Sequence, residues 1–278
     1  MIIWLASYPK SGNTWLRMFL RAYFLPNDKK FSINEEGNDD YEAKAFPNID
    51  LLRENEINYN KFEEIVKNWI NLQIFINLNN KINFLKTHNG NFNINGYPFT
   101  NSKNTIGGIY VVRDPRDVVL SLSNHFNITY EQAFNNMNNM QNYEFYDKNL
   151  TNGFRNSIMG TWSSNYNSWR YYQEKKIHLV KYEDMIKKPE NTFLEILKYL
   201  NLFLSFNIDE NKIKEAIKDT SFQNLKEMEN KAGFKELGSG DKFFRKGIIG
   251  DWEQTLNPQM IKNIETNFQK EMRELDYI

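Results

Sequence analysis

Short apolar runs alternate with amphipathic stretches along this chain. Four runs have the length and bulk of strands that are buried on both faces: IIWL (2–5), INFL (82–85), IYVV (109–112) and IHLV (177–180). Strands that alternate with helices favour an α/β fold with a parallel central sheet flanked by helices on both faces. The chain has no repeat and no Pro/Gly/Ser linker, so the pattern predicts a single domain over residues 1–278.

Three helices can be placed from the spacing of apolar residues. Apolar positions recur every three or four residues over 16–24, and this helix should end before Pro26. A second helix is expected near 61–76. A third covers 193–200, and Pro189 suits its first turn.

Three segments lack a clear period and are expected to be loosely packed. Residues 26–60 are polar and acidic, 124–152 mix Asn with aromatic residues, and 226–251 contain five glycines. A long aperiodic stretch inside a compact domain is usually disordered or a functional lid. We therefore expect 124–152 to line or cover a cleft.

The composition narrows the classes of partner. Thirty-five basic and thirty-five acidic residues cancel, so no global field favours nucleic acid or an anionic membrane. The absence of cysteine excludes a disulfide framework, a thiolate metal site and a cysteine nucleophile. No apolar run approaches the roughly 20 residues of a membrane span, and the N-terminus lacks the pattern of a cleaved signal. We expect a soluble cytoplasmic protein.

Polar clusters follow the four apolar runs directly. They are KSGNT (10–14), KTH (86–88), RDPRD (113–117) and KYED (181–184). In an open parallel sheet, ligands bind outside the carboxyl ends of the strands. The four clusters should therefore meet at one edge of the sheet. Because three of them are cationic or include a histidine, we expect a pocket for a multiply anionic ligand there.

Some of these residues also have plainer interpretations. Lys10 could be an exposed lysine beside a turn at Gly12, and Arg113 could form an i,i+4 ion pair with Asp117 on a helix.

A single histidine after a strand is more often structural than catalytic. His178 lies inside a predicted strand and His125 in a segment rich in Asn and Phe. Only His88 follows a strand beside a lysine, so we take it alone as a functional candidate.

The first cluster has the form of an anion-binding loop. YPKSGNTW (8–15) leads from a strand through a tight turn into a helix, where backbone N–H groups can bind an anion. Its lysine precedes the glycine, unlike the GxxxxGK[ST] loop of nucleotide hydrolases. This order disfavours a P-loop nucleotide kinase or NTPase, which remains the alternative.

With these motifs, the chain resembles the cytosolic-type sulfotransferases, which use 3′-phosphoadenosine 5′-phosphosulfate (PAPS). YPKSGNTW is similar to the family's 5′-phosphosulfate loop and YVVRDPRDVVLS (110–121) to its 3′-phosphate motif. KTH resembles its catalytic strand end, and FFRKGIIGDW (243–252) resembles its C-terminal PAPS loop. The resemblance implies a P-loop-like sulfotransferase fold, transfer of a sulfuryl group to a hydroxyl or amine of a small molecule, adenosine 3′,5′-bisphosphate (PAP) as a product, and no metal.

The resemblance also assigns roles to residues. The 5′-phosphosulfate would be held by Lys10, Ser11, Gly12, Asn13 and Thr14. The 3′-phosphate would be held by Arg113, Ser121, Arg245, Lys246 and Gly247, and the adenine by Trp15, Tyr182, Thr220 and Phe222. His88 would take the proton of the acceptor, and Lys86 and Lys10 would stabilise charge on the attacking and leaving oxygens.

Three departures from the family pattern affect these expectations. Asn13 stands where many members have Thr or Ser, which leaves the backbone donors intact. The chain begins at its first strand, so part of the acceptor pocket should be built differently. EQTLNPQM (253–260) lacks the Lys and Val of the animal dimer motif, so we do not expect that dimer. A non-catalytic nucleotide-binding module and a carbohydrate sulfotransferase are further alternatives.

Overall fold

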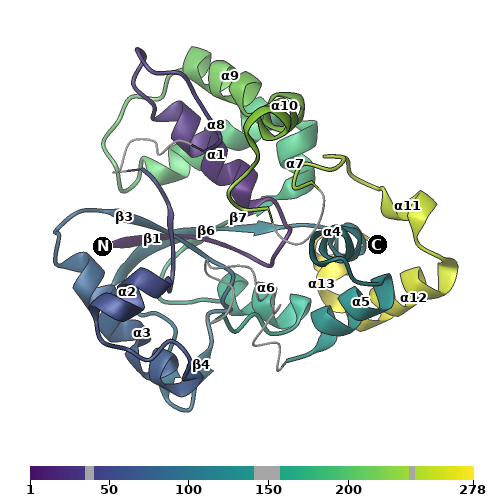
Figure 1. Cartoon of the computed structure of the whole chain (residues 1–278), viewed down its shortest axis with the longest axis horizontal. Coiled ribbons are helices and arrows are strands. Elements are labelled where there is room, and N and C mark those ends of the chain that lie inside the picture. The colour runs from purple at the N-terminus through teal and green to yellow at the C-terminus, as the bar shows by residue number, and fades with distance from the viewer. Residues whose placement is uncertain (35–40, 141–156, 238–241) are drawn as a thin grey trace.

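The computed structural model describes residues 1–34, 41–140, 157–237 and 242–278. Its centre is a parallel five-stranded sheet with the order β2-β3-β1-β6-β7 (Figure 1). The strands are β1 (Ile2–Ser7), β2 (Lys44–Ala45), β3 (Asn83–Thr87), β6 (Thr105–Val112) and β7 (Ile177–Lys181). A small antiparallel pair, β4 (Asn93–Ile94) and β5 (Tyr97–Pro98), lies outside this sheet.

Side chains of β1 alternate between two apolar clusters, one on each face of the sheet. Ile2 and Trp4 belong to one cluster and Ile3 and Leu5 to the other, and all four are buried. This is why the first apolar run shows no alternation of apolar and polar residues in the sequence.

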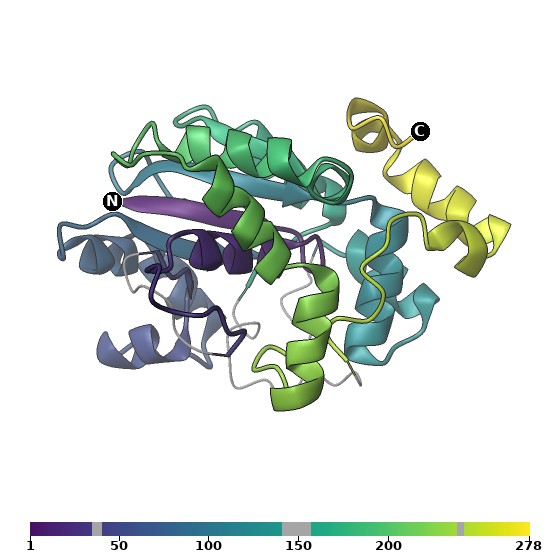
Figure 2. The same ribbon diagram turned by 90° about the horizontal axis from the view of Figure 1, so that it is seen from above.

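Helices cover both faces of the sheet (Figure 1). On one face lie α1 (Asn13–Tyr23), α7 (Tyr182–Lys187), α8 (Pro189–Leu200) and α9 (Glu210–Asp219), with α10 (Phe222–Ala232) beyond them. The other face carries α2 (Ile49–Glu54), α3 (Phe62–Asn77), α4 (Pro115–Phe126), α5 (Tyr130–Asn138) and α6 (Trp162–Arg170). The chain ends in α11 (Trp252–Thr255), α12 (Pro258–Asn267) and α13 (Gln269–Glu274). Figure 2 shows these last helices, in yellow, at one end of the sheet, where α12 packs on α4 and α5.

The α/β fold with a parallel sheet is confirmed, and so are the four predicted strands and three predicted helices. The strands extend one to four residues beyond the apolar runs at one end or the other. Pro189 occupies the first turn of α8, as expected.

The expectation of loose packing is wrong for parts of all three segments. Residues 44–45 form the short edge strand β2, and α2 follows it with Leu51 and Leu52 buried. Helix α5 buries Ala133, Phe134 and Met137, a spacing that the surrounding asparagines obscure. Residues 226–232 belong to α10. Residues 141–152 of the expected cleft-lining segment lie outside the described residues.

None of the helices in the described part of the chain combines the length and the apolar character needed to cross a lipid bilayer.

Candidate active site

A cavity of about 1010 Å³ opens where the strands β1, β3, β6 and β7 end. All four polar clusters contribute to its wall. The predicted site residues that line it are Lys10, Gly12, Asn13, Thr14, Trp15, Lys86, His88, Arg113, Ser121, Tyr182, Thr220, Phe222, Arg245, Lys246 and Gly247. Ser11 is the one predicted residue that does not line the cavity; it is fully buried in the loop.

The loop between β1 and α1 is shaped by two residues with positive φ. Lys10 has φ +64° and Gly12 has φ +105°. Gly12 precedes the first turn of α1, which has no side-chain cap, so its backbone N–H groups face the cavity without a competing side chain. Among the described residues, the buried Ser11 hydroxyl has no hydrogen-bond partner.

The side chain of Asn13 is used within the fold. Its Nδ2 donates to the carbonyl oxygen of Leu5 at 2.9 Å, and its Oδ1 accepts from Nε of Arg17 at 3.1 Å. The amide therefore ties the loop to β1 and α1. This agrees with the expectation that replacing Thr or Ser by Asn here leaves the backbone donors available.

His88 follows β3 and is nine-tenths buried. Its Nδ1–H donates to the carbonyl oxygen of Ser7 at 2.8 Å, which leaves the lone pair on Nε2. Burial and the neighbouring charge of Lys86 hold the pKa of His88 well below its usual 6.5. The imidazole is therefore neutral at physiological pH, as a general base must be.

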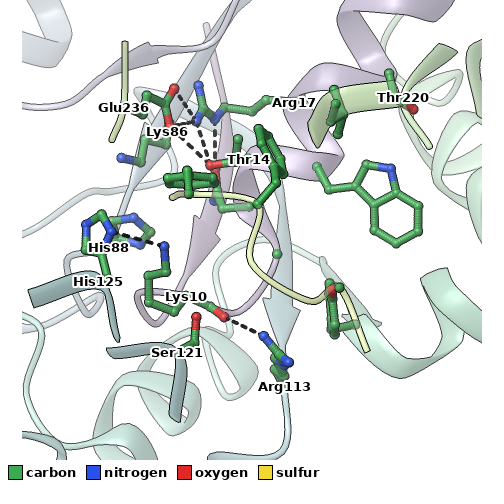
Figure 3. Close-up of a pocket in the computed structure, with 18 of the residues that line it drawn as sticks. Lys10, Thr14, Arg17, Lys86, His88, Arg113, Ser121, His125, Thr220 and Glu236 are labelled. Atoms are coloured by element: carbon green, nitrogen blue, oxygen red, sulfur yellow. Dashed lines mark hydrogen bonds and ion pairs between the residues drawn. The ribbon is translucent and has the colours of Figure 1, made fainter. Parts of the chain in front are cut away.

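Lys10 and Lys86 face the same part of the cavity (Figure 3). Burial lowers the pKa of Lys10 to about 7, against the attraction of Glu236 and with added repulsion from Arg113. Burial likewise lowers the pKa of Lys86 to about 8, and Glu236 again opposes the shift. Both lysines are thus poised to gain charge stabilisation when an anion arrives.

His125 lies on α4 beside Lys10, with Nδ1 at 3.4 Å from the lysine Nζ (Figure 3). Burial, with the charges of Lys10 and Lys86, lowers the pKa of His125 to about 3, so it is a neutral acceptor. The ring centroid of Phe243 lies 4.0 Å from Nζ and 5.9 Å from the ring centroid of His125. His125 thus lines the cavity as well, although the sequence singled out only His88.

Arg113 lies between the first loop, residues 8–12 between β1 and α1, and the late loop, residues 243–252, which carries Arg245 and Lys246. It donates to the carbonyl oxygens of Lys10 at 3.4 Å and Ile248 at 3.1 Å, and its guanidinium stacks on Tyr182 at 4.4 Å. Its ion pair with Asp117 is long, at 3.8 Å, so the i,i+4 interpretation describes part of its environment. Its Nε is buried and has no partner in the described part of the chain.

The late loop is held in place by a side chain of helix α4. Asp117 accepts hydrogen bonds from the N–H groups of Gly250 at 2.8 Å and Trp252 at 3.3 Å. Arg245 and Lys246 line the cavity and both pair with Asp251, at 2.9 and 2.6 Å.

The end of the cavity near α7 and α9 is more apolar. Trp15 packs edge-on against Tyr182, with ring centroids 6.1 Å apart. Phe222 packs against Gly247, where a Cβ would lie only 2.1 Å from the ring. The Thr220 hydroxyl donates to the carbonyl oxygen of Ala216 at 2.7 Å, so it serves helix α9.

The charged or titratable residues of the cavity that sequence reasoning missed include Arg17, His125 and Glu236. Arg17 stands one helical turn after Asn13, and this spacing could have identified it. His125 stands one turn after Ser121 on the same helix, which could have served in the same way. Glu236 lies in an aperiodic segment, where no local pattern marks it.

The chain matches the family model described as a sulfotransferase domain over residues 2–276. It therefore belongs to the sulfotransferase family, and the resemblance indicated by the motifs is confirmed. By class it is a PAPS-dependent sulfotransferase.

Among characterised relatives, luciferin sulfotransferase of Photinus pyralis is 24% identical over 271 residues, which cover 92% of this chain and 67% of that protein. Sulfotransferase 2A6 of Mus musculus is 30% identical over 169 residues, which cover 59% of this chain and 55% of that protein. The chain thus spans about two thirds of the first relative and about half of the second. Mouse sulfotransferase SULT7A1, solved in complex with PAP, has the same fold, with a TM-score of 0.59, 22% identity, and coverage of 98% of this chain and 84% of that one.

Proposed function

We propose that this protein transfers the sulfuryl group of PAPS to a hydroxyl group of a small-molecule acceptor, with an amine as the less favoured acceptor, and that His88 is the general base. The observation that carries this proposal is the meeting of Lys10, Lys86 and a neutral His88 in one cavity. The solved structure of SULT7A1 contains PAP, which supports the same nucleotide here. The names of the plant relatives, such as cytosolic sulfotransferase 16 of Arabidopsis thaliana, support a cytosolic location.

In the proposed step, Nε2 of His88 accepts the proton of the acceptor hydroxyl while the acceptor oxygen bonds to sulfur. The bond between sulfur and the bridging oxygen breaks, and its electron pair stays with that oxygen on PAP. Lys10 stabilises the negative charge that develops on the bridging oxygen, and Lys86 stabilises charge on the transferred group. Sulfuryl transfer resembles phosphoryl transfer in depending mainly on position and charge stabilisation.

The residues of the cavity fit the donor chemically. Backbone N–H groups at the start of α1 suit the 5′-phosphosulfate. The guanidinium of Arg113, whose buried Nε has no hydrogen-bond partner among the described residues, suits a 3′-phosphate, with Ser121, Arg245 and Lys246 near it. The Trp15 and Tyr182 rings offer faces and edges for the adenine.

The strand order indicates where the acceptor binds. The proposed nucleotide residues follow β7, β6 and β1, the proposed base follows β3, and β2 is the next strand along the sheet. The cavity continues on that side past Glu42, Lys44, Asn48 and Arg53. The acceptor would therefore lie against β2 and α2.

The experiment is a transfer assay with labelled PAPS and a panel of hydroxyl and amine acceptors. His88→Asn should lower turnover by about 10²- to 10⁴-fold, the usual contribution of general acid–base catalysis, while PAP binding stays within about twofold. His178→Asn is the matched control. His178 belongs to β7, stacks on Tyr199 of α8 and does not line the cavity. Near-normal turnover of His88→Asn would refute the base assignment.

The P-loop kinase or NTPase alternative is tested by titration. PAP should bind more tightly than Mg·ATP, because the cavity offers a fork for a 3′-phosphate and its loop lacks the GK[ST] order. Tighter binding of Mg·ATP would reverse the proposal.

A further inference from the structure

A carboxylate from a distant segment is bound inside the cavity. Glu236 accepts two hydrogen bonds from Nη2 of Arg17, each 2.7 Å long, although 219 residues separate the two in the chain. The side chains of Arg17 and Glu236 are 14% and 35% exposed, so the pair is largely shielded from water. Neither residue has a role in the proposed reaction so far.

The pair is attached to the anion-binding loop. The Thr14 hydroxyl donates to Oε2 of Glu236 at 3.1 Å and accepts from Nη2 of Arg17 at 3.2 Å. Arg17 also donates to Asn13 at 3.1 Å, so it bridges two loop side chains and the carboxylate (Figure 3). Glu236, which precedes the late loop in the chain, thus places its negative charge at the first turn of α1.

The basic side chains around the Glu236 carboxylate need a negative charge among them. Arg17 and Lys86 face Glu236 from α1 and β3, and Lys10 faces it from the first loop; Figure 3 shows these side chains on one side of the cavity. Although burial alone would raise it, the attraction of Arg17 and Lys86 lowers the pKa of Glu236 to about 2. Removing the carboxylate without a replacement would leave clustered cations uncompensated in a shielded site, which is strongly unfavourable.

A second glutamate of the same region, which is buried, shows the contrast. Glu229 accepts hydrogen bonds from the backbone N–H groups of Phe243 at 2.7 Å and Phe244 at 3.0 Å. Its carboxylate holds the late segment in place through the backbone. The hydrogen bonds of Glu236 instead come from the side chains of Arg17 and Thr14, both of which line the cavity.

We propose that Arg17, Thr14 and Lys86 form an anion subsite for the sulfuryl oxygens of the donor, and that Glu236 occupies this subsite until the donor binds. The inference rests on the proposed function, since it concerns the same cavity. A sulfuryl group carries one negative charge and presents oxygens to a guanidinium as a carboxylate does. The exchange therefore replaces one anion with another and leaves Arg17 and Lys86 compensated. Arg17 becomes a donor-binding residue, and Glu236 becomes an internal competitor of PAPS.

The test compares PAPS, which has the sulfuryl group, with PAP, which lacks it. Both are titrated without acceptor, by competition with a fluorescent PAP analogue. Arg17→Gln should weaken PAPS binding by about 10- to 100-fold, the range for one or two charge-assisted hydrogen bonds, and PAP binding by less than about threefold. Glu236→Gln should tighten PAPS binding by about three- to tenfold, because the competing charge is gone.

Each of the two residues has a matched control. Arg21→Gln changes another arginine of α1, which donates to Ser32 and lies over the Phe31 ring outside this cavity. Glu227→Gln changes a glutamate of α10 that contacts Gln223 on the surface. Both variants should leave the affinities for PAPS and PAP unchanged within about twofold. If Arg17→Gln does not fold, Arg17→Lys keeps the charge without the fork and should give an intermediate loss of PAPS affinity.

Two outcomes would overturn the inference. Equal loss of PAPS and PAP affinity in the Arg17 variant would show that Arg17 only supports the fold. Weaker PAPS binding in Glu236→Gln would show that the carboxylate helps to hold the donor rather than competing with it. If the unaltered protein binds neither ligand, the proposed function itself fails, which is a separate result.

Discussion

At the scale of single residues, the site depends on close approach as well as on charge. Gly12 combines φ +105° with a position where a Cβ would lie 2.5 Å from the Tyr182 ring. A side chain here would be strained by the backbone and would also displace the ring that stacks on Arg113. The first loop can therefore pack closely against Tyr182 only because residue 12 has no side chain.

Gly12→Ala should therefore weaken PAP binding by about tenfold or more, since positive φ alone costs about 1–3 kcal/mol for other residues. Isothermal titration measures the affinity. Gly96→Ala is a control for backbone strain, because Gly96 also has positive φ but has open space around it. Equal PAP affinity in Gly12→Ala and the unaltered protein would contradict this account.

The lysines of the cavity predict how binding depends on pH. The pKa values of Lys10 and Lys86, about 7 and about 8, rise when a phosphate binds, because an anion favours the charged ammonium. PAP affinity should therefore be highest where both lysines are already charged, and it should fall by about tenfold or more between pH 6.5 and 8.5. Calorimetry in buffers of different ionisation enthalpy should show proton uptake at pH 8. Lys10→Arg, whose charge does not titrate in this range, should flatten the dependence, and an unchanged slope would exclude Lys10 as its source.

At the scale of elements, helix α4 positions the late loop. Asp117 on α4 binds the N–H groups of Gly250 and Trp252, and Arg113 just before α4 donates to the carbonyl oxygen of Ile248. The segment that carries Arg245 and Lys246 therefore depends on the first turn of α4. This helix begins at Asp114, whose side chain caps it through the N–H of Arg116.

Asp117→Ala should weaken PAP binding by about tenfold, since it leaves two backbone N–H groups of the loop without their acceptor. It should have little effect on a ligand that lacks the 3′-phosphate, such as adenosine 5′-phosphosulfate. Glu265→Ala, which removes a partner of Arg116 on the same side, is the control. A similar loss for both ligands would mean that Asp117 supports the whole site rather than the late loop.

At the scale of the whole molecule, binding joins segments from most of the chain. The cavity wall runs from Lys10 to Asp251 and includes parts of both faces of the sheet. A ligand that touches all of these segments binds only the folded chain and stabilises it by mass action.

PAP at 100 times its dissociation constant should therefore stabilise the protein by about 2.7 kcal/mol, a rise in melting temperature of about 5 °C for a chain of this size. Scanning fluorimetry measures the shift. Arg113→Ala should need at least about tenfold more PAP for the same shift, because the 3′-phosphate loses its guanidinium. A full shift in that variant at unchanged concentration would argue against the 3′-phosphate role.

Much of the fold followed from local pattern because the central strands are buried on both faces and read as unbroken apolar runs. The sequence did not predict β2, because two residues of an edge strand carry no pattern. It did not predict α5 either, because the three buried residues of this helix stand among asparagines. All predicted site residues except Ser11 line the cavity, in part because ligands in a parallel sheet bind where the strands end. The roles assigned to these residues stay predictions until the variants are measured.

The amino-acid sequence by itself determined the order of strands and helices, the glycine turn before α1 and the charged clusters after each strand, because each depends on neighbours in the chain. Only the tertiary structure decided that Glu236 binds Arg17, that His125 faces Lys10 and that Asp117 holds the late loop. These contacts join residues more than 100 positions apart. They arise from how the helices pack on the sheet, which no local pattern encodes.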